Sequence, residues 1–186
     1  ELATGVLMTV DTVVWIASMT KAVTGACAMQ LVEQGRLSLD APINAVLPEL
    51  AAVQVLDGFD SNGDPILRAP KRDIALRHLL THTSGFVYNI WSADMGHHML
   101  QAGIPGINSC QNRALALPLL FDPGDRWDYG IGMDRAGKAV EAASAIKLGQ
   151  YLQQNILGLP AMRAHDFSQR PGTPPGIAPP HRPTPS

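Results

Sequence analysis

The sequence predicts an α+β domain in which helices dominate. Apolar residues recur at helical spacing in two long segments, 20–34 and 133–145, whereas only one pair of short β-prone runs flanks a turn-forming segment. The chain has 186 residues, of which 46% are hydrophobic. A chain of this length forms one domain and buries roughly two-thirds of the surface that it exposes when unfolded.

The first helix is expected at residues 20–34, because Gly35 is a natural C-terminal stop. Its apolar band consists of Ala22, Val23, Ala26, Cys27, Met29, Leu31 and Val32. Shorter helices are expected at 74–82 and 148–156, and residues 89–103 have a weaker helical pattern. Residues 53–56 and 66–68 are expected to form a hairpin, because Asn62-Gly63 between them suits the positive φ angles of a tight turn.

The composition changes after Phe167. Residues 168–186 contain seven prolines and no acidic residue, and Ile177 is their only large aliphatic side chain. Such a segment cannot build a core, so we expect a disordered, Pro-rich tail at 168–186 that follows a domain at 1–167.

Charge and composition exclude several classes of partner. The formal net charge is −2 and no basic block is present, so neither nucleic acid nor a membrane surface is an expected partner. No apolar run approaches about 18 residues and the chain opens without a signal peptide, which favours a cytoplasmic location. Cys27 and Cys110 are too few for a disulfide framework.

The tetrapeptide Ser18-Met19-Thr20-Lys21 places a hydroxyl and an amine three residues apart. Residues at this spacing share one face of a helix, so a helix that begins near Ser18 brings the two groups together. A serine becomes a nucleophile when a base takes its proton, and a lysine serves as that base once burial and nearby positive charge favour its neutral form. For the tetrapeptide alone, a helix N-cap serine is the commoner explanation.

A tyrosine is a suitable third group, because its phenol can be held as a phenolate by a nearby ammonium. The chain has three tyrosines, and Tyr129 is the best placed of them, next to Gly130 in a loop ahead of the helix expected at 133–145. An ordinary half-buried loop tyrosine is the alternative.

Four segments that include these residues resemble the serine beta-lactamase-related family: residues 10–21, 29–42, 76–85 and 121–130. The similarity extends over roughly residues 8–167, and the branch that it resembles most is the class C-like esterases, or family VIII carboxylesterases. The resemblance implies a beta-lactamase/transpeptidase-like fold. Strands that the family has before residue 11 and after residue 167 are missing, so the chain is expected to be mainly the helical half of a larger enzyme.

The resemblance also implies a mechanism. Ser18 attacks the carbonyl of a small-molecule ester and forms an acyl-enzyme, and Lys21 and Tyr129 share the general-base and general-acid steps, with no metal or other cofactor. The implied substrate site includes Trp15, His97 and Ile131. Because Ile131 stands where beta-lactamases have Asn or Ser, ester hydrolysis is favoured over lactam hydrolysis.

Alternatives remain open. Within the same fold they are a beta-lactamase, a D-alanyl-D-alanine peptidase or an acyltransferase, and outside catalysis an inactive truncated remnant. Two groups of side chains resemble metal sites but lack the ligands that complete them, so a hairpin turn and structural histidines are the favoured interpretations. These groups are Asp60, Asn62 and Asp64, and the pair His78 and His82.

Overall fold

The computed structural model describes residues 7, 9, 14 and 16–158. Trp15 and the predicted tail at 168–186 lie outside the described residues. The α-helices are α1 (Thr20–Glu33), α2 (Leu76–Leu80), α3 (Ala93–Gln101), α4 (Gly132–Ser144) and α5 (Leu148–Leu152), and the strands are β1 (Val55–Phe59) and β2 (Pro65–Arg68). Short 3-10 segments are η1 (Ala17–Met19), η2 (Ile43–Ala45), η3 (Pro48–Ala52), η4 (Ile107–Ser109) and η5 (Asn112–Leu115), and a π-helical turn, η6 (Gln153–Leu157), follows α5.

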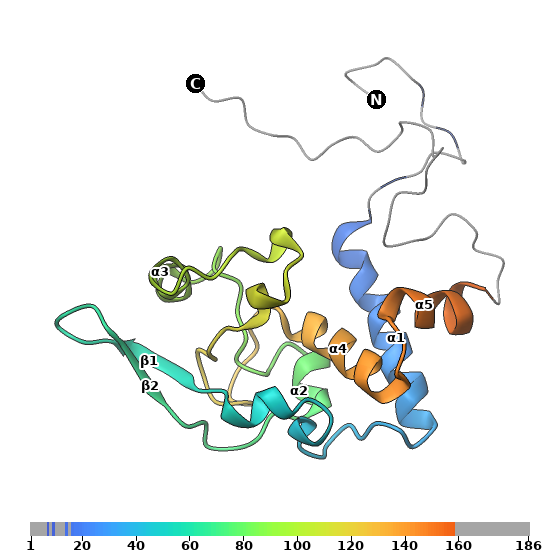
Figure 1. Ribbon diagram of the computed structural model, residues 1–186, viewed down its shortest axis with the longest axis horizontal. Coiled ribbons are helices and arrows are strands. Elements are labelled where there is room, and N and C mark those ends of the chain that lie inside the picture. The colour runs from blue at the N-terminus through green and yellow to red at the C-terminus, as the bar shows by residue number, and fades with distance from the viewer. Residues whose placement is uncertain (1–6, 8, 10–13, 15, 159–186) are drawn as a thin grey trace.

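Helices α1, α4 and α5 pack together at one end of the molecule (Figure 1). Small side chains make this possible, because Cys27 and Ala28 of α1 and Ala136 and Ala139 of α4 are all fully buried. Close approach of the two backbones lets a dense core form from short side chains. The expected helical segments 20–34, 133–145 and 148–156 are therefore confirmed.

Helix α1 ends as the sequence predicts, at a glycine in the left-handed region. Gly35 has φ +68°, its amide donates to the Val32 carbonyl at 2.9 Å, and the Arg36 amide donates to the Leu31 carbonyl at 2.9 Å. This pair of bonds is a Schellman motif, which satisfies carbonyls that a helix end otherwise leaves open.

The buried face of α1 differs from the predicted apolar band. The buried face of α1 carries Thr24, Cys27, Ala28 and Leu31. Three members of the predicted band are exposed instead: Ala22, Ala26 and Met29. The helix is apolar on more than one side, so helical spacing identified the helix without identifying its buried side.

Strands β1 and β2 form an antiparallel hairpin that extends away from the helical end (Figure 1). Gly63 has φ +84°, as a tight turn requires. Asp60 Oδ1 accepts hydrogen bonds from the amides of Asn62 and Asp64 at 2.8 and 2.9 Å, so this carboxylate stabilises the turn. Helix α3 begins at a serine cap, where Ser92 Oγ accepts from the Met95 amide at 3.2 Å.

A buried carboxylate joins the hairpin to the loop at 121–130. Arg68 donates two hydrogen bonds of 2.9 Å to the two oxygens of Asp122, and the Lys71 amide donates a third at 2.7 Å. Bidentate pairing of guanidinium and carboxylate is the strong form of this interaction. The loop that carries Tyr129 is thereby fixed at its start.

Candidate active site

Ser18 lies in η1, immediately before α1, and its side chain is exposed. The residue before it, Ala17, has φ +45°, in the left-handed region that costs a non-glycine residue roughly 1–2 kcal/mol. Lys21 lies in the first turn of α1, and its Nζ donates to Ser18 Oγ at 3.1 Å. The predicted meeting of hydroxyl and amine across one turn is present in the structure.

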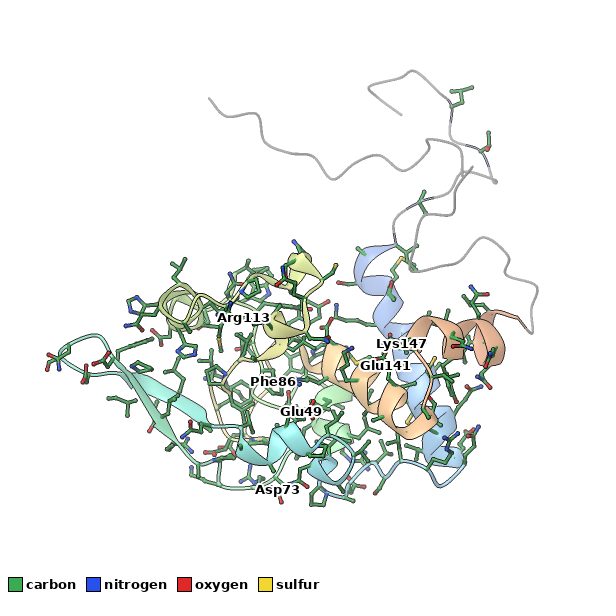
Figure 2. The ribbon with its side chains drawn as sticks, viewed as in Figure 1. Glu49, Asp73, Phe86, Arg113, Glu141 and Lys147 are labelled. Atoms are coloured by element: carbon green, nitrogen blue, oxygen red, sulfur yellow. The ribbon has the colours of Figure 1, made fainter. Side chains whose placement is uncertain are left out.

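Tyr129 comes to the same hydroxyl from the other side. Its phenolic oxygen donates to Ser18 Oγ at 2.9 Å across a separation of 111 residues. The loop is held against the segment 82–88, where the Tyr88 amide donates to the Tyr129 carbonyl at 3.3 Å. Gly130 lies so close to the carbonyl of Phe86 that a Cβ on residue 130 would clash with the carbonyl oxygen. Phe86 is labelled in Figure 2. The absence of a side chain at Gly130 thus sets the position of Tyr129.

The protonation state of Lys21 differs from the neutral form that the sequence analysis expects of a serine-activating base. Burial is the largest single influence on Lys21 and lowers its pKa, but hydrogen bonding to Tyr129 and the neighbouring phenols Tyr88 and Tyr129 outweigh it and leave the pKa raised. The hydrogen bond with Ser18, aided by Lys21, lowers the pKa of Tyr129. The arrangement therefore favours an ammonium at Lys21, rather than the neutral lysine expected from the sequence, and makes the Tyr129 phenol easier to ionise than a free phenol.

Two residues that sequence reasoning did not select border this cluster. The Lys21 Nζ lies 5.8 Å from the ring centre of Tyr88 and 5.1 Å from that of Tyr129. The His82 ring centre is 4.7 Å from that of Tyr129. His82 directly precedes the Thr83-Ser84-Gly85 turn and Tyr88 follows it three residues later, so their proximity to this turn is the signal that was available in the sequence.

The other predicted substrate residues occupy different positions. His97 packs edge-on against Phe59 of the hairpin, with ring centres 4.6 Å apart. Ile131 is only 1% exposed and belongs to the hydrophobic core. Ser18, Lys21 and Tyr129 meet, whereas no hydrogen bond or ring contact joins His97 or the Ile131 side chain to them among the described residues.

A cavity of about 340 Å³ lies beside the cluster, and its walls come from α1, α2, α4 and His82. It is lined by Lys21, Ala22, Gly25, Met29, Leu80, His82 and Met133. A larger cavity of about 450 Å³, lined by residues such as Glu49, Leu115 and Arg135, includes none of the three clustered residues. Cavity size alone therefore does not identify the site.

No group of three or more potential metal ligands occurs among the residues that the structure describes. Within the same residues, no helix is both long and apolar enough to cross a membrane. Cys27 is a buried free thiol and Cys110 an exposed one, in agreement with the expectation that they form no disulfide framework.

Comparisons with known proteins bear on the family and the fold. The beta-lactamase family model matches residues 1–183, a longer stretch than the resemblance over 8–167. Monacolin J acid methylbutanoyltransferase of Aspergillus terreus is 42% identical over 167 residues, which cover 87% of this chain and 40% of that protein. Lovastatin esterase of Penicillium rubens is 38% identical over 148 residues, with coverages of 78% and 37%.

A solved structure shows the fold as well as the sequence relationship. Unliganded simvastatin synthase (LovD) from Aspergillus terreus superposes with a TM-score of 0.75 at 41% identity, over 81% of this chain and 39% of that one. The predicted beta-lactamase/transpeptidase-like fold is confirmed. The chain spans about two-fifths of the length of the curated relatives that it matches.

Proposed function

Because the chain belongs to the beta-lactamase family, we propose that it is a serine acyl-transferring enzyme in which Ser18 carries the acyl group. The observation that supports this most directly is the position of Ser18 Oγ, which is 3.1 Å from Lys21 Nζ and 2.9 Å from the Tyr129 hydroxyl. A nucleophile within hydrogen-bond reach of a base, which is itself oriented by a third group, is the arrangement that covalent catalysis requires.

In the first half-reaction, Tyr129 first loses its proton to solvent, and its phenolate then accepts the proton of Ser18 while Oγ attacks the carbonyl carbon of an ester. The tetrahedral intermediate then expels the alcohol oxygen, which takes the same proton from Tyr129, and an ester bond joins Ser18 to the acyl group. Lys21 remains an ammonium throughout and stabilises the phenolate. The Ser18 amide supplies one donor for the developing oxyanion.

The second half-reaction repeats these steps with a new acceptor. Water yields the free acid, as in an esterase, and an alcohol yields a new ester, as in an acyltransferase. The relatives include both kinds of enzyme, named as acting on monacolin J acid and lovastatin. We therefore propose an acyl ester as the substrate and keep water and an alcohol as acceptors.

A fluorophosphonate probe tests the nucleophile. We expect the purified chain to be labelled at Ser18, located by peptide mass spectrometry, and we expect Ser18→Ala to abolish labelling. Ser109→Ala is the matched control, because Ser109 is also exposed in a short 3-10 segment. Absence of label from a chain shown to be folded by circular dichroism would contradict the proposal.

A second assay separates the acceptors and the bond types. p-Nitrophenyl esters are compared with a chromogenic cephalosporin, and each ester is assayed with and without an added primary alcohol. Faster release of p-nitrophenol together with a new ester product indicates acyl transfer, whereas release without such a product indicates hydrolysis. Turnover of the cephalosporin alone would overturn the proposed ester preference.

A further inference from the structure

His82 adopts a backbone conformation that is uncommon for residues with a side chain. Its φ is +58°, in the left-handed region that few residues other than glycine adopt, although histidine adopts it more often than most side chains. Neighbours hold it there: the Thr83 amide donates to the His78 carbonyl at 2.9 Å, and the Asp128 amide donates to the His82 carbonyl at 2.9 Å. The second bond ties His82 directly to the residue before Tyr129. Strain of this kind persists only where surrounding contacts enforce it.

The conformation directs the His82 ring towards the tyrosine. The ring lies against that of Tyr129, with centres 4.7 Å apart at 48°, and forms an edge contact with Trp127 at 6.3 Å and 74°. The same side chain lines the cavity beside Lys21. Its Nδ1 is buried, and it neither accepts nor donates a hydrogen bond within the part of the chain that the structure describes. No hydrogen bond joins the ring to Tyr129 among the described residues, so the ring acts on the phenol through packing contact.

We propose that His82 is a positioning residue, whose ring supports Tyr129 so that the phenolic oxygen stays at Ser18. This inference rests on the proposed function, because it concerns the same reacting hydroxyl. An aromatic ring at this position restricts the tilt of the phenol, and a hydrogen bond of 2.9 Å tolerates little displacement. Displacement of about 1 Å in a reacting group costs on the order of 10²-fold in rate.

The neutral form of the ring suits this role. Burial lowers the pKa of His82, and the positive charge of Lys21 lowers it further. A neutral imidazole supports the phenol without placing a second positive charge beside Lys21. The ring is thus compatible with the ammonium at Lys21 that stabilises the phenolate.

Chemical rescue tests the proposal. His82→Gly removes the ring and suits the positive φ, so the fold is expected to survive and leave a ring-sized space. We expect labelling of Ser18 by the fluorophosphonate to slow by about 10–100-fold, and added imidazole to restore part of the rate. Labelling is measured instead of ester turnover because imidazole itself cleaves aryl esters, and Ser18→Ala supplies the background.

A second variant and a control exclude a general loss of structure. His82→Asn tolerates the left-handed backbone without a ring, and we expect it to label as slowly as His82→Gly with an unchanged Tm. His78→Asn is the control, because the His78 Nδ1 accepts from the Ala75 amide at 3.1 Å and has no ring contact with Tyr129 among the described residues. We expect it to lower Tm and leave the labelling rate of the folded protein unchanged.

The outcomes separate the two proposals. Labelling of wild type with slow, imidazole-restored labelling of His82→Gly supports the positioning role. A wild-type rate in His82→Gly, or slow labelling that imidazole does not restore, overturns that role and leaves the proposed function intact. If His82→Gly does not fold, a wild-type labelling rate in His82→Asn overturns the role. Absence of labelling in folded wild type overturns both.

Discussion

The loop at 121–130 begins and ends in a charged cluster, and the two clusters differ in how completely their polar atoms are paired. At its start, Asp122 has a side chain only 2% exposed and accepts from Arg68 and from the Lys71 amide. At its end, Tyr129 is half-buried and shares the exposed Ser18 hydroxyl with Lys21. A saturated carboxylate stabilises a loop, whereas an accessible hydroxyl between two proton-binding groups is available to a substrate.

The comparison predicts that the clusters fail in different ways. Changes at the Ser18 end are expected to reduce rate with little effect on Tm, because Ser18 is exposed and η1 contains no buried residue. Changes at the Asp122 end are expected to reduce Tm with little effect on the rate of the folded protein, because Asp122 does not touch Ser18 among the described residues.

Tyr129→Phe tests the first statement and carries the largest expected effect. Removal of the phenolic oxygen eliminates the proposed base, and a general acid–base group contributes typically about 10²–10⁴-fold, so kcat on a p-nitrophenyl ester is expected to fall by that factor. Tyr151→Phe removes a buried hydroxyl elsewhere and serves as the control. Equal kcat values for Tyr129→Phe and wild type would show that the phenol takes no part.

The pH dependence of Ser18 labelling sharpens the same end of the comparison. The depressed pKa of Tyr129 places the rise in rate below the ordinary phenol value of 10.0, and the raised pKa of Lys21 keeps the ammonium beyond 10.5. Lys21→Met removes that ammonium, so the rise is expected at higher pH and the rate near neutrality is expected to fall. Labelling rates measured between about pH 6 and pH 10 decide this, and an unmoved profile in Lys21→Met contradicts it.

Asp122→Asn tests the other end. The change removes the buried carboxylate from Arg68 and leaves it only the exposed one of Asp57, so Tm by differential scanning calorimetry is expected to fall by several degrees. Arg68 and the Lys71 amide hold the pKa of Asp122 well below its ordinary value. A depressed folded pKa means that the stabilisation is complete above the unfolded value of about 4 and is lost as pH falls through the folded one. Asp122→Asn should therefore flatten the acid side of the wild-type Tm profile.

Asp40→Asn provides the smallest expected effect and a matched control for Asp122. Arg77 donates to both oxygens of Asp40 at 2.6 and 2.8 Å, so the pairing has the same bidentate form. The Asp40 side chain is 69% exposed, however, and solvent screens an exposed pair. We expect Tm to change by no more than a degree or two. A fall as large as that of Asp122→Asn would show that burial does not distinguish the two pairs.

Local chemistry accounts for the parts of the fold that could be predicted. Gly35 ends α1 and Gly63 turns the hairpin because each supplies a positive φ at low cost. Helix α2 was expected at 74–82 and occupies only Leu76–Leu80, since the Ile74 carbonyl accepts from the Ile43 amide and His82 has left the helical region. Contacts with distant segments set those ends, and a local pattern does not contain them.

The sequence by itself determined the Ser18–Lys21 contact, because residues three apart lie about one turn apart on the same face of a helix. Only the tertiary structure brought Tyr129 to the same hydroxyl, through the close approach of Gly130 to Phe86 and the fixed start of its loop at Asp122. The tertiary structure also placed Ile131 in the core and His82 against the phenol. Spacing along a chain specifies neighbours within a helix, whereas contacts across 111 residues depend on how whole elements pack.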